Sequence, residues 1–347
     1  MKLSIERIKE ITLGAERVYC EEGETVFRRF SEAEEAAYAE KNDGEQYYSE
    51  LYNRTFTTAG IKLSFRTNSK SIYIKFRAVD VMSSRSFFSL DIRSDGALVG
   101  SLDNFSGVSL PEKYYDVKLT IGEKEGCFEL PEGDKTVTLY LPWSVDCRLK
   151  ELSLDDGAYI HAAAKPDKVL ISYGDSITHG YDACYPVNRY MTKLSERLSA
   201  VEYCKAIGGE VFYPRLAELA EIEKPDYITV AYGTNDWGLA STKDEFKESC
   251  AAFYRAISEK YPNASIFAIT PIWRADFREY RPLGSFESIE ECIIEVTKAL
   301  PNVTAIRGFD LVPHDIKYYS DLFLHPNDEG FDFYFKNLYE CICKHAV

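Results

Sequence analysis

Four short blocks in the second half of the sequence carry the groups that acyl transfer needs. The first is Gly174-Asp-Ser176, which follows an apolar run, and the other three contain Gly209, Asn235 and His325. Hydrolysis of an ester through a serine requires a nucleophilic hydroxyl, a base that takes its proton, and donors for the oxygen that becomes negative. Ser176 is therefore the candidate nucleophile, and His325 is the candidate base.

Three N–H groups could form the oxyanion hole. They are the backbone N–H of Ser176, the backbone N–H of Gly209 and the side-chain amide of Asn235. Loss of one such donor typically lowers the rate by about 10²–10³-fold. Glycine suits the second position because the chain can approach the substrate there with no Cβ in the way.

Each candidate also has a plainer interpretation. Taken alone, Ser176 reads as the cap of a strand-to-helix turn, and His325 reads as an ordinary loop histidine. His179, three residues after Ser176, is a rival base, but on the first turn of a helix its ring should point away from the hydroxyl. The presence of all four blocks favours the catalytic interpretation of Ser176 and His325.

The elements that must position these blocks are those of an α/β fold. Strand-like runs at residues 169–172, 201–207, 227–231, 265–269 and 303–306 alternate with helix-length segments, and a last helix follows Pro326. This alternation predicts a mostly parallel sheet with helices on both faces. Ligands bind such sheets at the carboxyl ends of the strands, so the blocks are expected at one edge.

The first half of the chain has a different texture. Short β-rich runs at residues 60–65, 71–76, 86–92, 115–120 and 135–141 are separated by turn clusters and predict an antiparallel sandwich. Residues before about 45 read as an irregular, charged extension with one helix-like patch at 31–40. We therefore predict two domains. A jelly-roll-like β-sandwich with that extension spans residues 1–160, and a three-layer α/β/α domain spans residues 161–347.

The blocks GDS, GG, GTND and HPND, in this order along an α/β segment, resemble the SGNH (GDSL-type) hydrolase superfamily of esterases, acyl hydrolases and carbohydrate deacetylases. The resemblance covers about residues 165–345. It implies Ser176 as nucleophile and His325 as base. It also implies Gly209 and Asn235 as oxyanion donors beside Ser176. Because Ser176 lies in G-D-S-I-T and not in G-x-S-x-G, the nucleophile elbow of α/β-hydrolases is disfavoured.

One departure from the superfamily concerns the partner of His325. SGNH hydrolases usually carry D-x-x-H, whereas here Leu322 stands three positions before His325 and Asp321 stands four before. A one-residue bulge would bring Asp321 to the imidazole Nδ1. Alternatively, a backbone carbonyl takes that place and leaves a Ser–His dyad. We predict Asp321, since an orienting carboxylate is worth up to ~10⁴ in rate.

A sandwich before an SGNH-like domain is similar to two-domain carbohydrate esterases that deacetylate plant polysaccharides. Trp237, close to Asn235, and Trp273, after the fourth strand, are candidate sugar-stacking walls, with core packing as the alternative for both. We expect a serine esterase that hydrolyses an O-acyl ester, of acetyl size, on a carbohydrate through an acyl-enzyme. The alternatives are a short-chain lipase or lysophospholipase-type acyl hydrolase and a catalytically silent carbohydrate-binding protein.

Composition bears on partners and location. The formal net charge of −15 disfavours nucleic acid and anionic membranes as partners, so the expected partner is a small or oligosaccharide acyl ester. Nine scattered cysteines and the lack of an apolar leader predict a cytoplasmic protein with reduced thiols. The pair Cys341-Ile-Cys343 has no second pair or histidine at ligand spacing, so neither a metal nor a cofactor is expected. A homo-oligomer remains compatible with the sequence.

Overall fold

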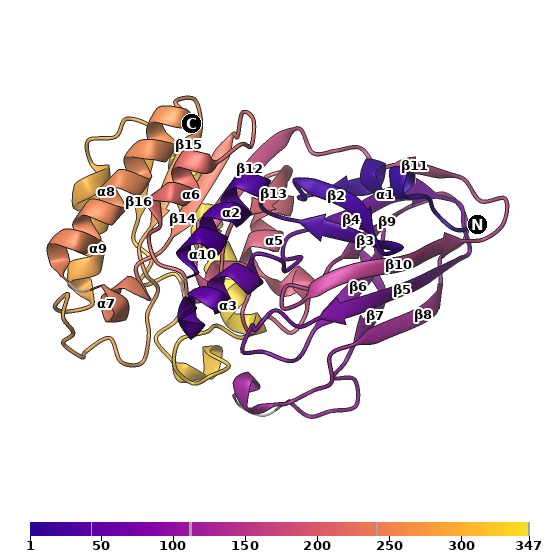
Figure 1. Ribbon diagram of the computed structural model, residues 1–347, viewed down its shortest axis with the longest axis horizontal. Helices are drawn as coiled ribbons and strands as arrows, with labels where there is room; N and C mark the ends of the chain where they lie inside the picture. The colour runs from indigo at the N-terminus through magenta and orange to yellow at the C-terminus, as the bar shows by residue number, and fades with distance from the viewer. Residues whose placement is uncertain (43, 111–112, 241, 346–347) are drawn as a thin grey trace.

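Alternating burial shapes the strands of the first half of the chain. In β5 (Ser71–Val79), Ile72, Ile74 and Phe76 are buried, while the residues between them are half-buried. This is the pattern of a sheet with one face on a core. The computed structural model describes residues 1–42, 44–110, 113–240 and 242–345. In it, these strands form two antiparallel sheets that enclose one apolar core, at the right of Figure 1.

One sheet of the sandwich has the strand order β1-β4-β9-β6-β7 with β11 also paired to β4, and the other has the order β2-β3-β10-β5-β8. Besides β5, the strands are β1 (Thr12–Leu13), β2 (Arg17–Glu21), β3 (Glu24–Arg28), β4 (Lys62–Thr67), β6 (Ser89–Ser94), β7 (Ala97–Asp103), β8 (Glu123–Glu129), β9 (Lys135–Tyr140), β10 (Asp146–Leu154) and β11 (Ile160–Ala162). The same half contains the helices α1 (Ile5–Ile11), α2 (Glu32–Lys41) and α3 (Gln46–Arg54), and the short 3-10 helix η1 (Tyr114–Asp116).

The second half forms a parallel sheet of order β13-β12-β14-β15-β16. Its strands are β12 (Lys168–Gly174), β13 (Ala200–Cys204), β14 (Tyr227–Ala231), β15 (Ser265–Ile269) and β16 (Val303–Ile306). Its helices are α4 (Ser176–His179), η2 (Pro186–Asn188), α5 (Tyr190–Arg197), α6 (Pro214–Leu219), α7 (Asp236–Leu239), α8 (Lys243–Lys260), α9 (Glu287–Thr297), η3 (Ile316–Tyr318) and α10 (Asp328–His345). Because β13 and β14 lie on opposite sides of β12, the strand order reverses at the carboxyl end of β12, where such folds bind ligands.

The predicted fold class is confirmed, including all five parallel strands and the helices between them. The strand expected at 115–120 is wrong, since the chain there forms η1 and an irregular segment. Ser86 explains the misleading alternation. Its hydroxyl donates to Val117 O and accepts from Leu119 N–H, which turns both apolar side chains onto one cluster without a strand partner. The predicted β-rich runs also did not include the strands β7, β8 and β10.

The prediction of an irregular extension before residue 45 is also wrong. The helix-like patch is α2, which Ser31 and Glu34 begin with a capping box, but the rest contains α1 and three strands. The charged residues of β3 concealed a buried strand, and these charges are paired with other strands of the same sheet. Arg28, for example, contacts Asp146 at 3.2 Å. The predicted boundary at 160 falls at the start of β11, which still pairs with β4.

Two helices of the first half cover the second domain instead of the sandwich. Phe30, Tyr38 of α2 and Leu51 of α3 share a core with Ile171 of β12 and Val230 of β14. In Figure 1, α2 and α3 lie between the sandwich strands and the outer helices α8 and α9. The two halves therefore share a hydrophobic core and are not linked by a single connection only.

Arg29 is the polar centre of this interface. It is fully buried, and its guanidinium donates at 2.8–2.9 Å to four backbone carbonyls. Two are those of Arg54 and Thr57 in the first half, and the other two are those of Cys204, which ends β13, and of Ala206 just after it. These bonds satisfy carbonyl groups that have no access to water. No helix among the described residues is long and apolar enough to cross a lipid bilayer.

Replacement of Arg29 by Met should lower the free energy of unfolding by about 3 kcal/mol or more, because each buried carbonyl left without a donor costs about 1–3 kcal/mol. Arg7→Met is the control, since the pair that Arg7 forms with Glu10 is exposed and its loss should change the free energy of unfolding by no more than about 0.5 kcal/mol. Urea unfolding followed by tryptophan fluorescence measures both. Equal midpoints for the two variants would refute the central role of Arg29.

Candidate active site

Ser176 stands on the turn between β12 and α4. Asp175 caps this helix, with its Oδ1 accepting the N–H of Ile177 at 3.0 Å. A Cβ at Gly174 would lie 2.4 Å from the hydroxyl of Thr178, so only glycine fits the strand end. Burial raises the pKa of Asp175 to about 6. Ser176 itself is 5% exposed.

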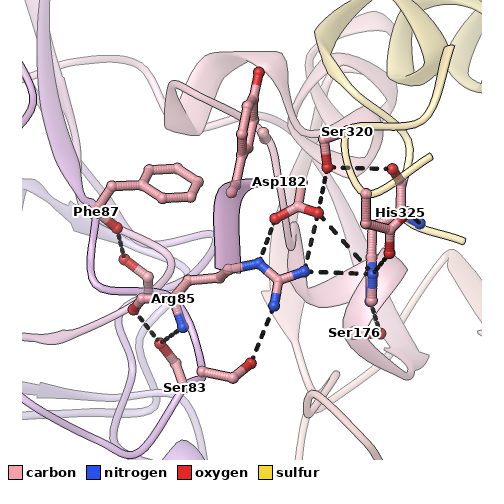
Figure 2. Close-up of polar contacts among 12 residues, drawn as sticks. Ser83, Arg85, Phe87, Ser176, Asp182, Ser320 and His325 are labelled. Atoms are coloured by element: carbon pink, nitrogen blue, oxygen red, sulfur yellow. Dashed lines mark hydrogen bonds and ion pairs between the residues drawn. The ribbon is translucent and has the colours of Figure 1, made fainter. Parts of the chain in front are cut away.

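His325 lies directly against the Ser176 hydroxyl. Its Nε2 is 2.8 Å from Ser176 Oγ, and its Nδ1 is 2.7 Å from Oδ2 of Asp321. Figure 2 shows the ring of His325 with Ser176 below it. When Nδ1 carries the proton donated to Asp321, the Nε2 lone pair faces the serine O–H. The three groups thus form a continuous hydrogen-bonded chain from carboxylate to hydroxyl.

Asp321 stands four residues before His325 instead of three, and one residue with left-handed backbone accommodates the extra position. Leu322 has φ 58°, a conformation that costs a non-glycine residue about 1–2 kcal/mol. The tight turn lets Asp321 Oδ1 accept the N–H groups of Phe323 at 2.9 Å, Leu324 at 2.7 Å and His325 at 3.1 Å. Burial alone would raise the pKa of Asp321, but the hydrogen bond and charge of His325, together with the backbone donors, lower it to about 2.

Three side chains fix the glycine loop after β13. His179 Nδ1 accepts the N–H of Gly208 at 3.1 Å, Arg54 donates to Gly208 O at 2.8 Å, and Tyr47 donates to Gly209 O at 2.9 Å. In a trans peptide the carbonyl of Gly208 and the N–H of Gly209 point in opposite directions, so the bond from Arg54 also sets the direction of that N–H. Gly209 has φ 88°, which a side chain would strain.

His179 is the rival base considered from the sequence, and the structure gives it another task. It is fully buried, with Nε2 at 2.9 Å from both the carbonyl of Trp143 and the hydroxyl of Thr57. Burial, reinforced by nearby arginines, holds its pKa well below the usual value. The neutral ring therefore donates from Nε2 and accepts at Nδ1, so it anchors Gly208 and has no nitrogen left for a serine proton.

Asn235 follows β14 at the same edge of the sheet. Its Nδ2 donates to the carbonyl of Glu210 at 3.0 Å, which leaves the second N–H of the amide for another acceptor. The neighbouring Asp236 accepts the N–H of Phe212 at 3.1 Å and of Gly233 at 3.0 Å. Burial raises the pKa of Asp236 to about 7. These bonds tie the Asn235 turn to the loop that carries Gly209.

The two tryptophans proposed as sugar-stacking walls lie in the core, so that prediction is wrong. Trp237 is 0% exposed, donates from Nε1 to Gly284 O at 2.9 Å and packs on Phe286. Trp273 is 7% exposed and stacks on the ring of His314 with centroids 5.9 Å apart. Each offers its faces to protein side chains, so the core-packing alternative is correct for both.

Two charged residues at the site escaped the sequence analysis. Arg85, on the loop between β5 and β6, donates from Nε and Nη2 to the carboxylate of Asp182 at 2.5 and 3.0 Å. Asp182 lies six residues after Ser176, and that proximity to a candidate nucleophile is the one signal that could have identified it. Asp182, Asp321 and His325 offer atoms within 4.8 Å of one another, as a cation site would, but Arg85 already supplies a positive charge there.

Known proteins resemble this chain in sequence and in fold. Residues 172–333 match the model of the GDSL-like Lipase/Acylhydrolase family. No curated protein matches the sequence. Among solved structures, the chain is similar to the salicylyl-acyltransferase SsfX3 from a tetracycline biosynthetic pathway, with TM-score 0.78, 20% identity, and coverage of 97% of this chain and 94% of that one.

Two further solved structures share the whole architecture. A putative GDSL-like lipase from Bacteroides ovatus aligns with TM-score 0.72 and 20% identity, over 99% of this chain and 97% of that one. A family two carbohydrate esterase from Cellvibrio japonicus aligns with TM-score 0.66 and 15% identity, over 99% and 97% of the two chains. At these identities the likeness establishes the two-domain fold.

The low pKa of Asp321 predicts an acid-dependent contribution to stability. A carboxyl group with a pKa near 3.9 in the unfolded chain and about 2 in the folded protein contributes stability that is complete above about pH 5 and is lost as the pH falls towards 2. The difference in unfolding free energy between wild type and Asp321→Asn should therefore shrink by about 1 kcal/mol between pH 6 and pH 3. Urea unfolding at each pH measures it, and a pH-independent difference would contradict the assignment.

Proposed function

We propose, from the premise that residues 172–333 form a GDSL-like lipase/acylhydrolase domain and hence a carboxylic ester hydrolase, that this chain removes acetyl-sized acyl groups from a carbohydrate through an acyl-enzyme on Ser176. The observation that carries the proposal is the chain of contacts from Asp321 through His325 to Ser176, at 2.7 and 2.8 Å. A buried serine hydroxyl alone is a weak nucleophile. Aligned with a neutral imidazole, it becomes competent for attack.

In the first half-reaction, Ser176 Oγ attacks the ester carbonyl carbon while its proton moves to Nε2 of His325. Asp321 keeps the ring oriented and stabilises the imidazolium. When the tetrahedral intermediate collapses, the C–O bond to the sugar breaks and the proton on Nε2 passes to the leaving sugar oxygen. In the second half-reaction a water molecule gives a proton to His325 and attacks the acyl carbon, and the released Oγ regains that proton.

Three donors would meet the oxygen that becomes negative, namely the N–H groups of Ser176 and Gly209 and the free N–H of the Asn235 side chain. Support comes from the way these groups are held. The Gly209 N–H is set by the bonds that fix its peptide plane, and the Asn235 amide is set by its bond to Glu210 O. Donors fixed before the reaction begins need no reorganisation as charge develops.

The surroundings of Ser176 support a short acyl group and a polar alcohol. Ser176 is only 5% exposed, and the ring of Tyr181 lies stacked on His325 with centroids 5.8 Å apart, which favours a small acyl group at the nucleophile. Phe323, on the turn that carries His325, is 37% exposed and offers an aromatic face for a sugar ring. Similarity to the family two carbohydrate esterase from Cellvibrio japonicus supports the same substrate class.

Acyl transfer to an alcohol is the second candidate function, because the salicylyl-acyltransferase shares both domains. An acyl-enzyme can be attacked by a sugar hydroxyl as well as by water, and the same base serves both reactions. The balance depends on whether an acceptor excludes water from the acyl carbon. A lipase-type activity would require an apolar groove for a long acyl chain, and a silent binding protein would not need the alignment of Ser176 with His325.

The catalytic roles are tested by single substitutions assayed with p-nitrophenyl acetate. Ser176→Ala should lose at least about 10³-fold in kcat, and Asp321→Asn should lose up to ~10⁴ if the carboxylate orients the base. Thr178→Ser, which keeps a hydroxyl group and lies in the same short helix as Ser176, is the matched control. Wild-type turnover by Ser176→Ala would end the proposal. A loss of only a few-fold in Asp321→Asn would favour the Ser–His dyad.

The substrate class is tested by acetate release from a panel of acetylated oligosaccharides, with and without unacetylated sugar as acceptor. Acetate esters should be cleaved faster than octanoate esters, since the low exposure of Ser176 favours a small acyl group. Faster cleavage of octanoate would favour the lipase alternative. Appearance of acetylated acceptor in place of free acetate would favour the transferase. Ser176→Ala must abolish every one of these products if they arise at this site.

A further inference from the structure

The sandwich places a buried arginine beside the catalytic histidine. Arg85 lies on the irregular segment between β5 and β6, which crosses from one sheet of the sandwich to the other. Figure 2 shows its side chain extending away from the sandwich to Asp182, with His325 and Ser176 beyond. Arg85 Nη2 lies 3.0 Å from Asp182 Oδ2 and 3.4 Å from His325 Nδ1. The guanidinium also lies over the ring of Tyr181, 5.4 Å from its centroid.

The segment that carries Arg85 is fixed at both ends of its path. Ser83 donates its hydroxyl to the carbonyl of Arg85 at 2.8 Å, and Ser144 donates to the carbonyl of Phe87 at 2.7 Å. Phe87 packs edge-on against Trp143, whose Nε1 donates to Ala183 O at 2.9 Å. Hydrogen bonds therefore hold the segment that carries Arg85 against the second domain, next to Asp182.

Asp182 holds the loop of His325 in place. Its side chain is fully buried, and its Oδ2 accepts the hydroxyl of Ser320, whose backbone N–H donates to the carbonyl of His325 at 2.9 Å. The same Oδ2 lies 4.0 Å from His325 Nδ1. Two carboxylates, those of Asp321 and Asp182, therefore face one imidazole N–H.

An uncompensated carboxylate in this position would disturb the base. A fully buried charge that loses its ion-pair partner costs several kcal/mol. Without Arg85, Asp182 would keep the hydroxyl of Ser320, and the next donor within reach is the N–H of His325 Nδ1, 4.0 Å from Oδ2. If the Nδ1–H of His325 turned from Asp321 towards Asp182, the ring would rotate and Nε2 would move away from Ser176 Oγ. Paired with Arg85, Asp182 has no need of that proton.

We propose that Arg85 is a positioning residue for the esterase, and that the sandwich domain completes the active site by neutralising Asp182. This inference rests on the proposed role of His325 as base. Arg85 keeps the Nδ1–H of His325 directed at Asp321 and limits the negative charge around the ring. The charged groups that face His325 are then Asp321, Asp182 and Arg85, with the buried Asp175 behind the nucleophile.

The test is the kinetics of Arg85→Gln with p-nitrophenyl acetate from pH 4 to pH 9. Misorientation of the base should lower kcat by about 10–10²-fold, while KM stays within about twofold. Loss of a cation with Asp182 still charged favours the protonated imidazole, so the acid limb of the kcat/KM profile should move to higher pH by about one unit. Arg77→Gln is the matched control, because Arg77 forms a bidentate pair with Glu24 within the sandwich and should change neither quantity.

Rescue separates positioning from a purely structural role. The double variant Arg85→Gln/Asp182→Asn replaces the ion pair by two neutral amides and should recover most of the kcat and the wild-type acid limb. Arg85→Lys, which keeps the charge without the bidentate geometry, should lie between Arg85→Gln and wild type and serves in its place if Arg85→Gln does not fold. Thermal melts and near-ultraviolet circular dichroism establish folding for each variant.

Two outcomes would overturn the inference. One is an Arg85→Gln enzyme with wild-type kcat and an unmoved acid limb. The other is a double variant no more active than Arg85→Gln, which would make the arginine a structural residue only. Either result, combined with an inactive Ser176→Ala, refutes the role of Arg85 and leaves the proposed esterase intact. Wild-type activity of Ser176→Ala would instead refute the esterase mechanism itself.

Discussion

The carbonyl groups at the end of β13 and in the glycine loop after it are the constraint on which the site depends. They are buried at the edge of the parallel sheet where the glycine loop forms, and the donors that the described residues show for them come from the first half of the chain. Arg29 supplies donors to Cys204 O and Ala206 O, and Arg54 supplies one to Gly208 O. Because a buried carbonyl without a donor is costly, the loop takes its shape only when the first part of the chain is packed against it.

The two domains therefore meet at the candidate active site. The sandwich and its helices contribute donors to the glycine loop, an apolar contact through Trp143, and a charge beside His325 through Arg85. The solved structures with the same fold align over both domains. The sandwich and its helices thus contact the loops that carry Gly208 and His325.

Local patterns predicted the parallel sheet and the positions of Ser176 and His325, because strand-end residues of such a sheet meet at one edge. They failed for Trp237, whose burial depends on Phe286 and Gly284, residues distant in the chain. They also failed for Arg85, an arginine in an irregular segment with no periodic neighbour. Its importance arises from the docking of two domains, and neither composition nor spacing encodes that contact.

The left-handed Leu322 has a consequence for how catalytic motifs are recognised. One extra residue between acid and base is accommodated by a single change of backbone hand, and Asp321 still reaches His325 Nδ1 at 2.7 Å. A spacing of three residues is thus one of several ways to bring a carboxylate to Nδ1 of the histidine. A search that demands D-x-x-H would class this sequence as lacking its acid, and relatives with similar insertions are open to the same misclassification.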